Sequence, residues 1–173
     1  MSPKKNFTEE LKHETNNTRK ILERLPMEKL SWKPHEKSMN LERLSQHIAE
    51  LPTWITLTIK QDELDFAKGY TPSPKFNSTE ELIEQLNKNV ALATKALEET
   101  TDEHLLKPWT LRNGEQIFFT MPRAVVIRNM VFNHIIHHRA QLGVYLRLLN
   151  VPLPTIYGPT ADESVMPKAA TAN

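Results

Sequence analysis

Histidine is the residue type with most scope for chemistry in this sequence, because the chain has no cysteine. That absence excludes disulfides, thiolate zinc sites and a protein thiol nucleophile. Three histidines lie close together as His134, His137 and His138, and His47 lies on the apolar face of an earlier segment. Side chains four residues apart share one face of a helix, so His134 and His138 can present two imidazoles to one ion. A facing helix could supply a third ligand, and His47 is the candidate for it.

The spacing leaves two alternatives open. His137 falls on an apolar stripe nearly as good as the one that contains His138, so periodicity does not decide which of them pairs with His134. A histidine on an apolar face is also commonly a hydrogen-bonded core residue. Two imidazoles brought together without a shared proton or ion would waste hydrogen-bonding capacity, which favours the metal site.

Three further residues are candidates for roles beside the histidines. Glu14, together with Thr15 and Thr18, interrupts the apolar stripe of the first predicted helix, where a carboxylate could act as an acceptor behind a ligand or as a proton shuttle. The alternative is that the helix turns its polar face at this point. Gln141 and Tyr145 follow the histidine pair and could line a pocket, although a tyrosine at this spacing also suits a core position with its hydroxyl at the rim.

Four amphipathic helices are predicted to position these residues, over about 6–25, 40–59, 78–97 and 122–149. Asn6, Asn40 and Ser78 are suitable N-cap residues. Pro52 lies inside the second segment and cannot donate a backbone hydrogen bond, so we expect a kink about one turn after His47. The prolines between the segments mark the ends of the helices.

Between the third and fourth helices, residues 109–119 contain two β-favouring runs around Asn113-Gly114, which is a hairpin signal. Residues 61–77 show little periodicity. The same is true of the end of the chain, and residues from about 161 to 173 are predicted to form a frayed tail.

Length and composition favour one domain over residues 1–173, with an all-α fold: a four-helix bundle that has a short β-hairpin or extended loop before its last helix. The chain of 173 residues is 39% hydrophobic and 25% charged, which is ordinary for a globular protein. Its 22 basic and 21 acidic residues are interleaved, so no nucleic-acid or anionic membrane partner is expected. Neither a signal-peptide apolar region nor a membrane-spanning apolar run is found, and we expect a cytoplasmic protein.

The two histidine segments together resemble the DinB-like family. The resemblance rests on residues 133–147 (NHIIHHRAQLGVYLR) and 151–163 (VPLPTIYGPTADE), and on Trp32-Lys-Pro-His, Lys37-Ser-Met and residues 44–54 (LSQHIAELPTW). It spans about residues 11–163. It implies a four-helix bundle that binds a divalent metal through His47, His134 and His138, with His137 as a neighbour and not a ligand.

The family resemblance also implies an activity, because members include transferases and isomerases that use bacillithiol, mycothiol or glutathione. We therefore expect a metal-dependent enzyme that transfers a low-molecular-weight thiol to an electrophilic small-molecule substrate. The alternatives are a non-catalytic metal-binding helical module and a metal-assisted hydrolase. Imidazole ligands suit zinc, nickel and iron alike. Homodimers are common in the family, so a homodimer is expected as well.

Overall fold

The computed structural model describes residues 2–69, 71 and 73–163 of the chain. Most of this part is helical, and a small three-stranded sheet accompanies the helices. The α-helices are α1 (Pro3–Leu22), α2 (Leu41–Glu50), α3 (Thr53–Lys60), α4 (Thr79–Glu99), α5 (Asp102–Leu106), α6 (Arg123–Ile127) and α7 (His134–Leu148). Shorter turns are η1 (Met27–Lys29) and η2 (Phe66–Lys68), and a π-helical turn, η3 (Arg128–Asn133), joins α6 to α7.

The helix starts follow capping chemistry. The Asn40 side chain accepts a hydrogen bond from the Arg43 N–H (2.9 Å), and the Ser78 hydroxyl accepts one from the Glu81 N–H (3.2 Å), as predicted. The first helix begins earlier than predicted. It starts at Pro3, with Ser2 as its N-cap, and not at Asn6. Pro3 suits this first-turn position, where its missing N–H would have no partner in the helix.

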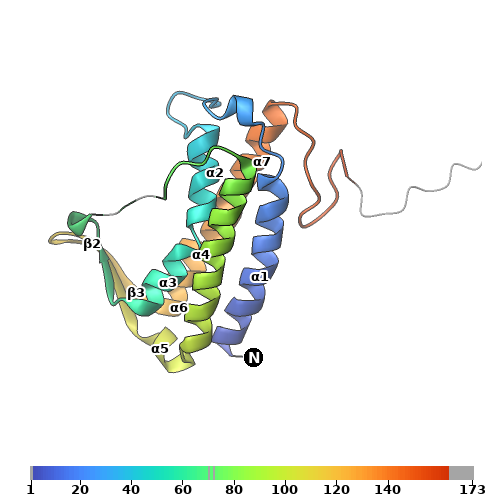
Figure 1. Ribbon diagram of the computed structural model, residues 1–173. Coiled ribbons are helices and arrows are strands. Elements are labelled where there is room, and N and C mark those ends of the chain that lie inside the picture. The colour runs from blue at the N-terminus through green and yellow to red at the C-terminus, as the bar shows by residue number, and fades with distance from the viewer. Residues whose placement is uncertain (1, 70, 72, 164–173) are drawn as a thin grey trace, which may run out of the picture.

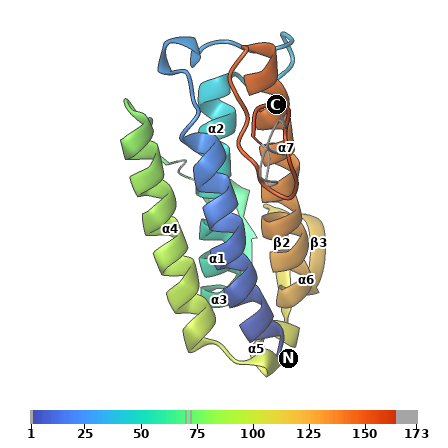
Figure 2. The same cartoon turned by 90° about the vertical axis from the view of Figure 1, so that its right-hand side faces the viewer.

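The long helices lie side by side in both views (Figures 1 and 2). Helices α2, α3 and α4 run in one direction, and α1 and α7 run in the opposite direction, so the long connection after α3 returns the chain to the start of α4 (Figure 1). Helix α4 packs on α1, α2 and α3, while α7 packs on α2 and α1. The segment α2 with α3 is thus enclosed between α4 and the last helices.

Two buried apolar clusters fill the space between these helices. One contains Phe7 and Leu11 of α1 with residues of α3, α6 and η3, and the other contains Ile21 and Leu22 with residues of α2 and α7. The α1 and α7 residues between the two clusters are polar and buried: Glu14, Asn17 and Thr18 of α1, and His138 and Arg139 of α7. A buried polar layer therefore divides the core, and its groups must be satisfied within the protein.

Two of the predicted helices are interrupted. The second one breaks at Pro52 into α2 and α3, one turn after His47, which confirms the expected kink in a stronger form. The fourth was predicted as one continuous helix, and this is wrong because η3 inserts a wider turn directly before His134. A π turn adds one residue to the helical repeat and so rotates the following helix relative to the preceding one. With this insertion Ile127, Val131 and Phe132 are all buried.

The sheet consists of β1 (Glu63–Asp65), β2 (Pro108–Asn113) and β3 (Gln116–Pro122), in that order across the sheet. Strands β2 and β3 form the predicted antiparallel hairpin, with Gly114 at φ 59° in its turn. The parallel strand β1 and helix α5 were not predicted, so the all-α class with a hairpin needs this correction. Strand β1 has only three residues, which are too few to show the alternation of apolar and polar residues that predicts a strand.

The last described residues are held by ion pairs to α7 and to Arg24, which follows α1. Asp162 pairs with Arg147, and Glu163 pairs with Arg24. The frayed tail was predicted to begin at about residue 161, but Asp162 and Glu163 are held by these ion pairs. The rest of the predicted tail, residues 164–173, lies outside the described residues. No described helix is both long enough and apolar enough to span a bilayer.

Candidate metal centre

Three histidines meet where α2 packs against α7. The Nε2 atom of His134 lies 2.8 Å from Nε2 of His138 and 3.5 Å from Nε2 of His47. One nitrogen from each ring can be chosen so that all three lie within 4.8 Å of one another. His134 and His138 are on the same face of α7, as their spacing of four predicts, and the kinked α2–α3 segment brings His47 opposite them.

The other side of each ring has its own partner, which leaves the Nε2 atoms free to converge. His138 Nδ1 is 2.8 Å from Gln141 Oε1, an acceptor, so Nδ1 carries the hydrogen and Nε2 presents its lone pair. His134 hydrogen-bonds the backbone of Met130. His47 Nδ1 lies 3.8 Å from Glu50 Oε2. Metal-binding histidines are usually oriented in this way by a carbonyl, amide or carboxylate behind the ring.

Glu50 is itself firmly held. Its carboxylate accepts hydrogen bonds from Arg43 Nη1 (3.0 Å) and from the Ser73 N–H (3.0 Å). Burial acts to raise the pKa of Glu50, but the contacts with His47, Arg43 and Ser73 outweigh it and lower this pKa below the usual range. A charged carboxylate therefore stands behind His47.

Burial keeps the rings of His134 and His138 neutral. It lowers the pKa of His138 to about 4, with the neighbouring His134 and His47 rings adding to the effect. The pKa of His134 is lowered for the same reasons, burial first and His47 second. Imidazole nitrogens that converge with neither a proton nor a cation between them leave their hydrogen-bonding capacity unused. The donor set thus fits a borderline divalent ion that accepts nitrogen ligands.

The remaining predicted residues fall into two groups. Gln141 contacts His138 directly, so it lies beside the cluster as expected. Tyr145 instead takes the packing position: its ring meets Trp32 edge to face, and its hydroxyl donates to the Met39 carbonyl (3.3 Å). His137 is exposed and is not part of the three-histidine group, although its ring centre is 4.9 Å from that of His138.

Glu14 is not part of the three-histidine group and instead contacts Arg139 of α7. Its Oε2 atom is 2.5 Å from Arg139 Nη2 and accepts a hydrogen bond from the Tyr157 hydroxyl (2.6 Å). Arg139 also donates to the Glu14 carbonyl, to Thr18 Oγ1 (both 3.2 Å) and to the Tyr157 hydroxyl. We refer to Glu14, Arg139 and Tyr157 as the ion-pair cluster. Within the described residues, Glu14 makes no contact with the three converging histidines.

Two residues with clear roles were not among the predicted ones. Glu50 follows His47 by three residues, so one helical turn separates them, and this spacing was the signal available in the sequence. Tyr157 lies in an irregular segment without periodicity, and its contact with Glu14 joins residues 143 positions apart. No local pattern could have indicated that contact.

The fold and the site define a helical protein with a three-histidine group that could hold a metal ion, and comparison with known proteins identifies the family. The family model described as "DinB family" matches residues 1–169, so the chain belongs to the DinB family. A DinB-like protein from Bacillus cereus ATCC 10987 is similar, with 25% identity, a TM-score of 0.68, and coverage of 88% of this chain and 97% of the other. A DinB-like protein from Bacillus subtilis (YjoA) has 20% identity and a TM-score of 0.69, covering 87% and 97%. No functionally curated protein matches the sequence.

Proposed function

We propose that the protein is a divalent-metal-dependent enzyme that transfers a low-molecular-weight thiol to an electrophilic small molecule, with His47, His134 and His138 as the metal ligands. The observation that carries the proposal is the convergence of three imidazoles, two of which are kept neutral by burial. Within the described residues the group contains no fourth histidine and no carboxylate. Three protein ligands with an open position are typical of catalytic sites, whereas structural sites are closed by four.

A divalent ion held by three neutral imidazoles supplies a Lewis acid whose open position favours the deprotonated form of an incoming thiol. The chain's own residues do the rest. Gln141 fixes the ring orientation of His138, and Glu50 stands behind His47 as a charged acceptor. Because the protein has no cysteine, the nucleophilic sulfur must come from a cosubstrate.

The surroundings favour a thiol over water as the nucleophile. Glu50, the carboxylate beside the cluster, already accepts from Arg43 and Ser73 and is therefore a poor general base. A thiol ionises near pH 8.5, roughly, and so needs less assistance than water, whose pKa is about 15.7. In the transfer, the sulfur forms a bond to the electrophilic carbon, the carbon's bond to its leaving group breaks, and the thiol proton passes to solvent.

The test is turnover with defined metal content. The purified protein is stripped with a chelator and reloaded with zinc, nickel or ferrous iron. It is then assayed with bacillithiol, mycothiol or glutathione and 1-chloro-2,4-dinitrobenzene, which releases chloride as the thioether forms. We expect turnover with at least one thiol that needs the metal, is lost in His134→Ala and is kept in His137→Ala. One bound ion per chain without turnover of any thiol would instead support the non-catalytic metal-binding module. Turnover of an ester in its place would support the hydrolase.

The proposal also covers the setting of the enzyme: one domain built as a four-helix bundle, acting in the cytoplasm, where low-molecular-weight thiols are kept reduced. We also propose that the protein forms a homodimer. Light scattering on the metal-loaded protein would give twice the 20.0 kDa chain mass if the dimer forms.

A further inference from the structure

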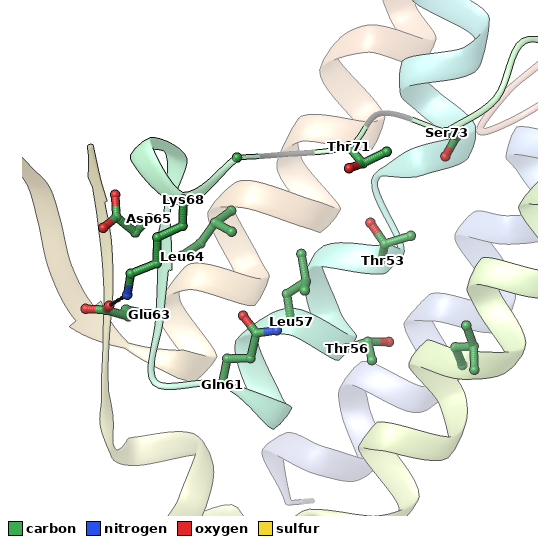
Figure 3. Close-up of a pocket in the computed structure, with 12 residues that line it drawn as sticks. Thr53, Thr56, Leu57, Gln61, Glu63, Leu64, Asp65, Lys68, Thr71 and Ser73 are labelled. Atoms are coloured by element: carbon green, nitrogen blue, oxygen red, sulfur yellow. Dashed lines mark hydrogen bonds and ion pairs between the residues drawn. The ribbon is translucent and has the colours of Figure 1, made fainter. Parts of the chain in front are cut away.

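A second cavity, distinct from the histidine cluster, lies between α3 and the β1–η2 segment. Its volume is about 520 Å³, within the size range of small-molecule sites. Figure 3 shows Thr53, Leu57 and Gln61 along α3 on one side and Glu63, Leu64 and Lys68 on the other. None of the three converging histidines lines it. We call it the α3 cavity.

The charged groups at the α3 cavity are already matched with one another. Glu63 pairs with Lys68 Nζ (2.9 Å) and with Arg112 (3.5 Å). Asp65 pairs with Arg112 (3.8 Å) and accepts the N–H groups of Ala67 (3.0 Å) and Gly114 (2.9 Å). Two carboxylates thus face two cations. A charged ligand would have to separate one of these pairs, and its own charge would find no unmatched partner.

Unlike the charged groups, most of the neutral polar side chains of the α3 cavity are not paired with other protein groups. Within the described residues, the side chains of Gln61, Thr71 and Ser73 make no hydrogen bond to the protein; those of Gln61 and Thr71 are exposed and that of Ser73 is half-buried, so only water competes with a ligand for them. The Thr53 hydroxyl donates to the Glu50 carbonyl (2.7 Å), which leaves its lone pairs to accept. Leu57, Leu64 and Leu92 contribute apolar surface between these groups. The wall therefore offers several neutral donors and acceptors beside an apolar face.

We propose that the α3 cavity binds a neutral polyhydroxylated molecule of about monosaccharide size. Such a molecule can exchange hydroxyl hydrogen bonds with the amide of Gln61 and the hydroxyls of Thr53, Thr71 and Ser73 without disturbing the ion pairs. Its C–H faces can pack on the leucines. An apolar ligand would leave these polar groups unpaired, and an anion or cation would meet a wall whose charges already cancel.

The α3 cavity also adjoins the residues behind the metal centre. The Ser73 backbone N–H donates to Glu50 Oε1 (3.0 Å), and Glu50 Oε2 lies 3.8 Å from His47 Nδ1. A ligand at Ser73 is therefore separated from a histidine of the cluster by a single side chain. Binding in the α3 cavity does not require a metal, so it can be tested on the stripped and the loaded protein alike.

Three probes of one size and different charge test the proposal: methyl glucoside, glucuronate and N-methylglucamine. Their binding to the full chain is measured by saturation-transfer NMR and titration. We expect methyl glucoside to bind with a dissociation constant of about 1–10 mM, as befits so few atoms, and the two charged probes to bind at least about fivefold more weakly. No transfer to methyl glucoside at about 20 mM, or equal binding of all three probes, would overturn the proposal.

Variants then locate the binding. Leu92 is 49% exposed on α4, so Leu92→Trp can cover the cavity without emptying the core, and it should weaken methyl glucoside binding about tenfold. Val144→Trp, at a 60% exposed position of α7, is the matched control and should change nothing. Gln61→Leu should weaken binding severalfold, and Gln61→Glu should shift the preference towards N-methylglucamine. Thermal melting verifies that each variant is folded, and binding that is unchanged in both Leu92→Trp and Gln61→Leu would contradict the α3 cavity as the site.

Discussion

His138 and Arg139 are consecutive residues of α7, yet they belong to two polar clusters of different character. Both side chains are buried, with 7% and 2% of their surface exposed. Arg139 faces α1, where Glu14, Thr18 and Tyr157 satisfy its donors. His138 faces α2, where its ring centre lies 4.8 Å from that of His47, and its Nε2 is 2.8 Å from Nε2 of His134 on its own helix. The ion-pair cluster has complementary charges, whereas burial keeps His134 and His138 of the histidine cluster neutral.

The difference separates a structural role from a functional one. A buried carboxylate beside a buried guanidinium needs nothing further, because each satisfies the other. Three imidazoles that converge could instead share a cation from outside the chain, as the proposed function requires. The same helix thus holds one cluster whose charges are matched within the chain and one that we propose to bind an ion. Four predictions test this distinction.

The largest expected effect is on the ion-pair cluster. Arg139→Ala leaves the Glu14 carboxylate, which is only 4% exposed, without its cation. We expect a loss of about 3–5 kcal/mol in the free energy of unfolding, the usual cost of an uncompensated buried charge. Urea denaturation measures it. The double variant Glu14→Leu with Arg139→Met removes both charges and should cost far less, and an equal cost for the two variants would show that the ion pair is not the cause.

The histidine cluster should respond to metal and not to charge removal. A metal that binds the folded chain raises its stability by about 2.7 kcal/mol at a free concentration one hundred times the dissociation constant. For a chain of this length that corresponds to roughly 5–10 °C in melting temperature. Chelation should remove the gain, and His47→Ala, His134→Ala and His138→Ala should abolish it, while His137→Ala keeps it. A melting temperature that does not change on chelation of protein shown to be loaded would contradict the metal site.

Glu50 and Gln141, which contact the rings of His47 and His138, should affect the metal affinity less than the histidines themselves do. Glu50→Gln removes the charge behind His47, and Gln141→Leu removes the acceptor that orients His138. Each should weaken metal binding by about 10- to 100-fold while the ligand set remains complete. Competition with a chromogenic chelator measures the affinity, with His137→Ala as the control. Unchanged affinity in both variants would mean that the rings are held by packing alone.

Periodicity was sufficient to predict most of the long helices, but it left His137 and His138 open as partners of His134. The i, i+4 spacing allowed His134 and His138 to meet, the family resemblance chose His138 over His137, and Pro52 indicated the break that separates α2 from α3. The capping residues Asn40 and Ser78 were also readable, because a cap depends only on its own first turn. These are local relations, and sequence spacing describes them directly.

Features that depend on distant contacts were not predictable. Strand β1 has three residues and exists through its pairing with β2, which follows more than forty residues later. The η3 turn depends on how α6 and α7 pack, and the spacing of the apolar residues alone allowed a continuous helix. His47 could be proposed from its apolar face, but its meeting with His134 required α2 and α7 to be neighbours. For the same reason Glu14 was expected near the metal, while the fold gives it Arg139 as its partner.

The smallest effect should come from Tyr157, which completes the ion-pair cluster. Although 61% of the surface of Tyr157 is exposed, partial burial of its hydroxyl raises the pKa of Tyr157 to about 12, and its hydrogen bond to Glu14 contributes in the same direction, while Arg139 opposes it. The folded pKa thus lies above the unfolded value of about 10, so the neutral hydroxyl stabilises the fold. This contribution is complete below pH 10, roughly, and is lost as the pH rises towards 12.

Tyr157→Phe should cost about 1 kcal/mol at neutral pH. Above about pH 10 the stability of the wild type should fall more steeply than that of Tyr157→Phe, so the two should converge, as urea denaturation across this range would show. Parallel curves would mean that the hydroxyl does not donate to Glu14, and that the ion-pair cluster consists of Glu14 and Arg139 alone.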